Sequence, residues 1–151
     1  MAKSNVIDML SGDKAHKQYA ALPYTVRNGD VSILLVTSRE TRRWIIPKGW
    51  SKKTLAPCQV AALEAFEEAG LLGEVASEPC TSFTYWKQIS EKKKKYCEVD
   101  VFMFCVLGEA ETWPEMFERK RSWMSLEDAS LCISDPDLST FLRGLSPGDF
   151  M

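Results

Sequence analysis

Residues 49–71, GWSKKTLAPCQVAALEAFEEAGL, contain the pattern that decides the fold. Pro57 suits the first position of a helix, alanines are dense after it, and Gly70 is placed for a left-handed C-terminal cap. We therefore predict a helix over residues 57–69, entered from a polar loop over residues 48–54.

Three glutamates gather on one side of this predicted helix. Successive helical residues are about 100° apart, so Glu64, Glu67 and Glu68 share an arc of about 100°. No Lys or Arg occurs from residue 54 to residue 86. The helix therefore offers these charges no partner, and the macrodipole near its C-terminus disfavours them further. The opposite side, taken as the core face, carries Ala62, Ala65, Phe66 and Ala69.

This acidic arc is expected to face outward or into a cleft. A divalent cation such as Mg²⁺ or Mn²⁺ would relieve the repulsion, because hard cations prefer clustered carboxylate oxygens. The alternative is an acidic surface that is simply solvated.

Strand-forming runs precede and follow the helix. Residues 19–26 and 31–37 flank Asn28-Gly29, a strong signal for a two-residue hairpin turn. Further strands are predicted over residues 44–46, 81–89, 96–107 and 121–124, and further helical segments over 125–129 and 137–145. This order favours an α/β (α+β) fold, with a mixed β-sheet covered on both faces.

The chain has 151 residues, of which 45% are hydrophobic, as expected for one globular domain. We expect a loosely ordered leader over residues 1–17 and a single domain over residues 18–151. No apolar run is long enough to span a bilayer, so no membrane association is expected. The five cysteines are odd in number and lack CxxC spacing, which favours the reducing cytoplasm.

Positive charge is clustered although the net charge is −2. That balance argues against a general nucleic-acid surface, so no stable nucleic-acid partner is expected, and nothing indicates the oligomeric state. The basic residues beside the predicted helix are Arg39, Arg42, Arg43, Lys48, Lys52 and Lys53. They suggest a polyanionic ligand that faces the acidic arc. Lys92–Lys95 form a second run, for which a solvated turn is the alternative and a module binding RNA or protein a further one.

The segment 49–71 resembles a Nudix box: Gly, five residues, Glu, seven residues, Arg-Glu, aliphatic, any residue, Glu-Glu, any residue, Gly, aliphatic. The matching residues are Gly49, Glu64, Ala65, Glu67, Glu68, Gly70 and Leu71. Leu55 stands where the first Glu belongs, and Leu63 where the Arg belongs. Residues 33–38 and 43–49 resemble the strand, loop and strand that lead into the box in the diphosphoinositol polyphosphate phosphohydrolase branch. Residues 123–129 are similar to the closing strand and helix start of the Nudix family, so the resemblance covers roughly residues 18–143.

The resemblance implies a Nudix-like α/β/α sandwich and metal-assisted attack of water on a small-molecule diphosphate. The substrate would be a nucleoside diphosphate derivative, a dinucleoside polyphosphate or a diphosphoinositol polyphosphate. Mg²⁺ or Mn²⁺ would be held by Glu64, Glu67 and Glu68, the catalytic carboxylates, together with Gly49. The substrate phosphates would meet Arg39, Arg42, Arg43, Lys48 and Lys52.

Two points stay open at the level of the sequence. The general base could be Glu98 or Glu111, from elsewhere in the chain. Leu63 cannot pair with Glu67 one turn later, as an arginine there would. A degenerate domain that binds such a ligand without turnover is therefore the alternative to an enzyme.

Overall fold

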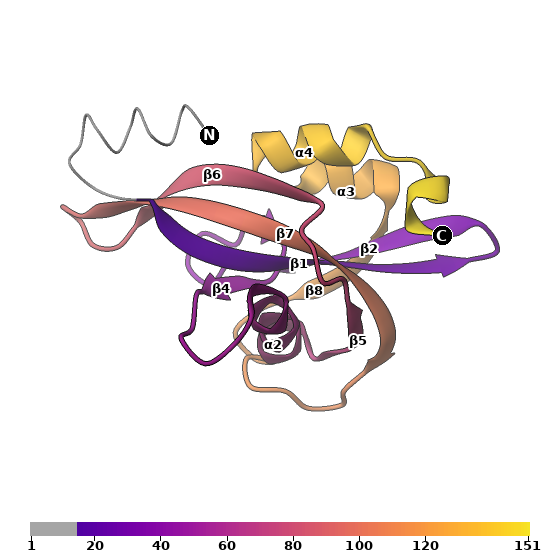
Figure 1. Cartoon of the computed structure of the whole chain (residues 1–151), viewed down its shortest axis with the longest axis horizontal. Helices are drawn as coiled ribbons and strands as arrows, with labels where there is room; N and C mark the ends of the chain where they lie inside the picture. The colour runs from indigo at the N-terminus through magenta and orange to yellow at the C-terminus, as the bar shows by residue number, and fades with distance from the viewer. Residues whose placement is uncertain (1–14) are drawn as a thin grey trace.

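The computed structural model describes residues 15–151 (Figure 1). The first strand begins at His16, so His16 and Lys17 of the predicted leader belong to the sheet. Residues 1–14 of that leader lie outside the described residues.

The strands are β1 (His16–Arg27), β2 (Asp30–Thr37), β3 (Trp44–Ile45), β4 (Lys48–Trp50), β5 (Leu71–Val75), β6 (Thr81–Gln88), β7 (Lys94–Glu109) and β8 (Arg121–Ser125). The helices are α2 (Pro57–Ala69), α3 (Leu126–Cys132), α4 (Pro136–Arg143) and the 3₁₀ turn η1 (Pro147–Phe150). Among these residues no helix is long and apolar enough to cross a membrane.

The strands form one mixed sheet with the order β3-β2-β1-β7-β5. The central strands β1 and β7 are parallel, whereas the other pairs are antiparallel. Helix α2 covers one face of the sheet, and α3 and α4 cover the other (Figure 1). The predicted α/β/α sandwich with a mixed sheet is confirmed.

The hairpin turn and the helix that the sequence predicted most strongly are both present in the structure. Asn28 and Gly29 both have positive φ, 53° and 83°, as a tight I′ hairpin turn between β1 and β2 requires. Helix α2 has the predicted bounds and ends on Gly70 with φ 68°. Ala56 provides no side-chain cap, but its N–H donates to Gln59 Oε1 at 2.8 Å, which satisfies one free donor of the helix start.

Two short strands correct the sequence prediction. Residues 48–54 were expected to form a loop, but β4 occupies the first three and pairs with β1, Gly49 opposite Tyr19. Strand β5 follows α2 directly and pairs with β7. Both strands form through partners distant in the sequence, so a local pattern does not reveal them.

Candidate active site

The acidic residues of α2 lie against the sheet. Its buried residues are Val60, Ala61, Glu64, Ala65, Glu68 and Ala69. Glu64 is 7% exposed and Glu68 is 4% exposed, whereas Glu67 is half-buried. The expectation that the carboxylates and the core alanines occupy opposite sides of the helix is therefore wrong for Glu64 and Glu68. These two residues form a buried carboxylate pair one helical turn apart.

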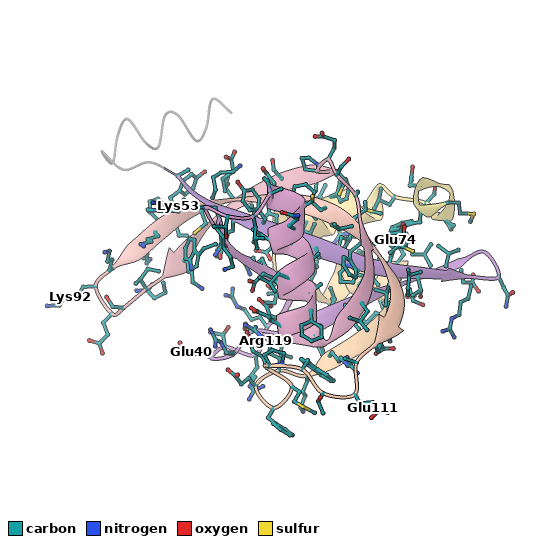
Figure 2. All side chains as sticks on the ribbon, turned by 60° about the horizontal axis from the view of Figure 1, so that its bottom comes forward. Glu40, Lys53, Glu74, Lys92, Glu111 and Arg119 are labelled. Carbon is teal, nitrogen blue, oxygen red and sulfur yellow. The ribbon has the colours of Figure 1, made fainter. Side chains whose placement is uncertain are left out.

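Cations from other elements approach this pair. Lys52 Nζ lies 3.9 Å from Glu64 Oε2, and Arg119 Nε lies 3.8 Å from Glu68 Oε1. The expected lack of a charge partner thus holds only within the helix itself, because the loops before α2 and before β8 bring cations to it. Figure 2 shows Arg119 beside the end of α2.

The electrostatics of the pair are those of buried acids. Burial raises the pKa of Glu68 to about 8, although Arg119 and Lys48 oppose this shift. Burial also raises the pKa of Glu64. Oxygen Oε1 of Glu68 is buried and has no hydrogen-bond partner among the described residues. A buried acceptor without a partner is costly, so a ligand that binds this oxygen would stabilise the site.

Gly49 is packed directly on this pair through β4. A Cβ at this position would lie 2.7 Å from both Cγ and Oε2 of Glu64. Only a residue without a side chain fits there while Glu64 keeps its place. The pairing of β4 with β1 holds the Gly49 backbone in that position.

The loop between β7 and β8 adds two residues that the sequence interpretation missed. Glu115 N donates to the backbone oxygen of Glu67 at 3.0 Å, which docks the loop on the last turn of α2. Arg119 Nε donates to Glu115 Oε1 at 2.9 Å. The run Arg119-Lys120-Arg121, which leads into β8, was a sequence signal for this basic side chain.

The predicted phosphate-binding arginines lie on an exposed loop that meets the same β7–β8 loop. Arg39 pairs with Glu118 at 3.2 Å, and Arg42 Nη1 donates to the backbone oxygen of Glu118, also at 3.2 Å. Arg43 Nε donates to Thr41 Oγ1 at 3.0 Å. All three arginines are exposed, so they are accessible to a ligand.

The predicted lysines have different environments. Lys52 is beside Glu64, as described. The ammonium of Lys48 lies 5.2 Å from the centroid of the Tyr85 ring, and burial lowers its pKa. In Figure 2, Lys92 is at the far tip of the β6–β7 hairpin, remote from Arg119. Lys95, nearer the base of that hairpin, lies 5.5 Å from the Trp50 ring.

Neither predicted general base is presented to the buried carboxylate pair as Glu115 is. Glu98 is paired with Lys17 at 3.0 Å. Glu111 is exposed, and Figure 2 shows it well apart from Arg119. Glu115 is the carboxylate that the β7–β8 loop places within reach of Arg119 and the end of α2.

A divalent cation suits the chemistry of these donors. Within residues 15–151, no three His, Cys, Asp or Glu side chains are grouped closely enough to hold a metal ion unaided. The two carboxylates of Glu64 and Glu68, one of which has an oxygen without a hydrogen bond, nevertheless match a hard cation, because Mg²⁺ commonly uses one or two carboxylates and fills its other positions with water and substrate oxygens. Glu64 and Glu68 therefore have the chemistry that a bound Mg²⁺ or Mn²⁺ ion would require.

Known proteins resemble this chain in sequence and in fold, although no protein-family model matches the chain. Nudix hydrolase 17, mitochondrial, of Arabidopsis thaliana is 30% identical over 106 residues, 70% of this chain and 56% of that protein. Diphosphoinositol polyphosphate phosphohydrolase 3-alpha of Mus musculus is 30% identical over 115 residues, 75% of this chain and 66% of that protein. The chain thus spans between half and two thirds of the length of these relatives.

A solved structure shares the architecture. The crystal structure of C. elegans Ap4A hydrolase superposes with a TM-score of 0.60 and 20% identity, covering 85% of this chain and 94% of that one. The fold is therefore that of the Nudix hydrolases. The chain belongs to the Nudix hydrolase superfamily, and it resembles the diphosphoinositol polyphosphate phosphohydrolase branch.

Proposed function

We propose that this protein is a pyrophosphohydrolase that uses Mg²⁺ or Mn²⁺ to cleave a phosphoric anhydride bond in a small molecule. The observation that carries the proposal is the buried carboxylate pair of α2, with Glu68 Oε1 left without a partner. Burying two carboxylates side by side costs stability, and a divalent cation would offset that cost.

We assign each residue of the candidate site a role from its position around α2. Glu64 and Glu68, with Glu67 and the Gly49 carbonyl beside them, would hold the cation. When bound, the cation would neutralise the diphosphate charge and activate water as a Lewis acid. Arg39, Arg42, Arg43, Lys48 and Lys52 would bind the phosphates of the substrate. Glu115 is proposed as the general base, because its loop is docked on the end of α2.

The substrate class is proposed from the relatives. One curated relative is named for diphosphoinositol polyphosphates, and one structural neighbour for the dinucleoside polyphosphate Ap4A. A polyanion of either kind would suit the exposed arginines of the 38–43 loop. Nucleoside diphosphate derivatives are the third candidate class.

Residues 18–151, together with His16 and Lys17 of β1, are proposed to act as one domain that needs no membrane and no nucleic acid. We place the protein in the cytoplasm, although one Arabidopsis relative is named as mitochondrial. The free state of its five cysteines fits a reducing compartment.

The test is a screen of the three substrate classes with millimolar Mg²⁺ or Mn²⁺, with release of phosphate or mononucleotide as the readout. We expect metal-dependent turnover of at least one class, and its loss in Glu68→Gln. Glu127→Gln, an exposed carboxylate on α3, is the matched control. If the native chain bound these compounds without turning them over, the result would instead support the alternative of a degenerate binding domain, which the replacement of the pattern's arginine by Leu63 suggested.

A further inference from the structure

A buried guanidinium lies next to the acidic helix, although the helix itself lacks one. We infer that Arg119 supplies, from the β7–β8 loop, a positive charge that the last turn of α2 lacks, and so positions Glu68 for catalysis. This inference rests on the proposed function, because it names a positioning residue for that reaction.

Position 63 cannot perform this role in the native chain. Leu63 is half-buried on α2 and carries no charge. The last turn of α2 contains no basic residue. The carboxylate of Glu68 must therefore be held from outside the helix.

Arg119 is fixed on three sides. Its Nε donates to Glu115 Oε1 at 2.9 Å and lies 3.8 Å from Glu68 Oε1, and its Nη1 donates to the backbone oxygen of Thr37 at 3.1 Å. Its side chain is 9% exposed. A guanidinium held in this way occupies one position, which is what orienting a carboxylate requires.

The backbone around Arg119 is anchored as well. Lys120 N donates to Thr37 Oγ1 at 2.9 Å, and Thr37 N donates to the backbone oxygen of Lys120 at 3.0 Å. On the other side, Glu115 is bonded to the last turn of α2. The loop thus joins the end of β2 to the end of α2 and places the guanidinium between them.

Arg119 differs from the arginines that we assign to the substrate. The side chain of Arg39 is 59% exposed, against 9% for Arg119. Two N–H groups of Arg119 already donate hydrogen bonds, to Glu115 and to the backbone oxygen of Thr37. A positioning role therefore suits it better than a phosphate contact.

The first experiment uses the metal-free protein and needs no substrate. Thermal unfolding is measured for the native chain, Arg119→Gln, Glu68→Gln and the double variant. Removing the guanidinium breaks its hydrogen bonds to Glu115 and Thr37 and its contact with Glu68, so we expect Arg119→Gln to lower Tm by about 5 °C or more. In the Glu68→Gln background the same change should cost clearly less, because the two residues act on each other.

The second experiment separates positioning from substrate binding. On any substrate found by the screen, Arg119→Gln should lower kcat about tenfold to a hundredfold while KM changes little. Arg119→Lys, which keeps the charge and loses the planar fork, should fall between the native chain and Arg119→Gln and serves if the latter does not fold. Arg27→Gln, exposed at the end of β1, is the control.

Two outcomes would overturn the inference. The first is equal Tm losses with and without Glu68. The second is a rise in KM with kcat unchanged, which would make Arg119 a substrate ligand. If the native chain turns over no diphosphate, the proposed function fails together with the catalytic role of Arg119, whereas the metal-free cycle still shows whether Arg119 and Glu68 interact.

Discussion

The helices on the two faces of the sheet bury different kinds of side chains against it. Under α3 and α4 an apolar cluster contains Ala129, Leu138 and Leu142 of the two helices. Ile133, which follows α3, and Phe150 of η1 belong to the same cluster. Under α2 the helix contributes buried Ala61, Ala65 and Ala69 to the cluster, with Cys58 and Ala62 partly buried against it, and Glu64 and Glu68 lie buried beside the alanines.

This difference separates stability from function. Large apolar side chains bury more surface, so the α3–α4 face contributes more hydrophobic stabilisation for each residue. Alanines on α2 let the helix lie close to the sheet and leave room for two acids that weaken the fold. The α3–α4 face therefore stabilises the domain, and the α2 face carries the proposed site.

The largest effect is expected from Glu68→Gln on the α2 face. The change removes the charge of a proposed metal ligand and nearly keeps its shape, so kcat should fall by about a hundredfold or more. The stability of the metal-free protein at neutral pH should be nearly unchanged, because burial keeps Glu68 protonated there and the amide is a neutral group of nearly the same shape. Steady-state kinetics and thermal unfolding measure the two effects. If the variant kept native turnover, α2 would not be the active site.

The opposite result is expected from Leu142→Ala on α4. Leu142 is fully buried, so its truncation should reduce the free energy of unfolding by about 2 to 4 kcal/mol. At a temperature where the variant is folded, kcat should stay within about twofold of native. Denaturant unfolding and kinetics provide the comparison. A loss of kcat as large as that of Glu68→Gln would show that the two faces are not functionally separate.

A smaller effect is expected from Gly49→Ala. The added methyl group would meet Glu64, so the carboxylate must move, at a cost of about 1 to 3 kcal/mol in stability. Turnover should fall about tenfold or more, because the proposed ligand is displaced. Gly108→Ala is the matched control, since nothing lies within 4 Å of the Cβ that it would add. Equal effects of the two changes would remove the assigned link between Gly49 and Glu64.

The pH dependence of stability should distinguish the buried acid from ordinary ones. Burial raises the pKa of Glu68 from 4.5 to about 8, so the folded state keeps a proton that the unfolded state releases between these values. The free energy of unfolding of the metal-free protein should fall as pH rises from about 4.5 to about 8 and level off above that. Over this range Tm should drop by about 5 °C more than in Glu68→Gln. Glu111→Gln, an exposed change, should follow the native curve. A native curve parallel to that of Glu68→Gln would mean that Glu68 is ionised throughout.

The sequence was most informative where structure depends on neighbouring residues. The Asn28-Gly29 turn and the helix from Pro57 to its cap at Gly70 formed as predicted, because turn and cap chemistry are local. The short strands β4 and β5 were missed, since distant partners create them.

The residues of the candidate site also fall into those that the sequence predicted and those that it did not. The spacing of the α2 glutamates was readable, but their burial was not, because an alanine stripe does not show how far the buried face extends around the helix. Glu115 and Arg119 were missed for a different reason. They lie in a loop about 50 residues beyond α2, and tertiary contacts alone bring them to Glu67 and Glu68.

The central claim is that the buried carboxylate pair of α2 is a divalent-cation site. The most direct test is thermal unfolding of the native chain, Glu68→Gln and Glu127→Gln at neutral pH, each with and without millimolar Mn²⁺. A ligand that binds only the folded state raises Tm, so we predict a rise of about 3 °C or more for the native chain and for Glu127→Gln, and almost none for Glu68→Gln. No rise in the native chain, or an equal rise in Glu68→Gln, would contradict the claim.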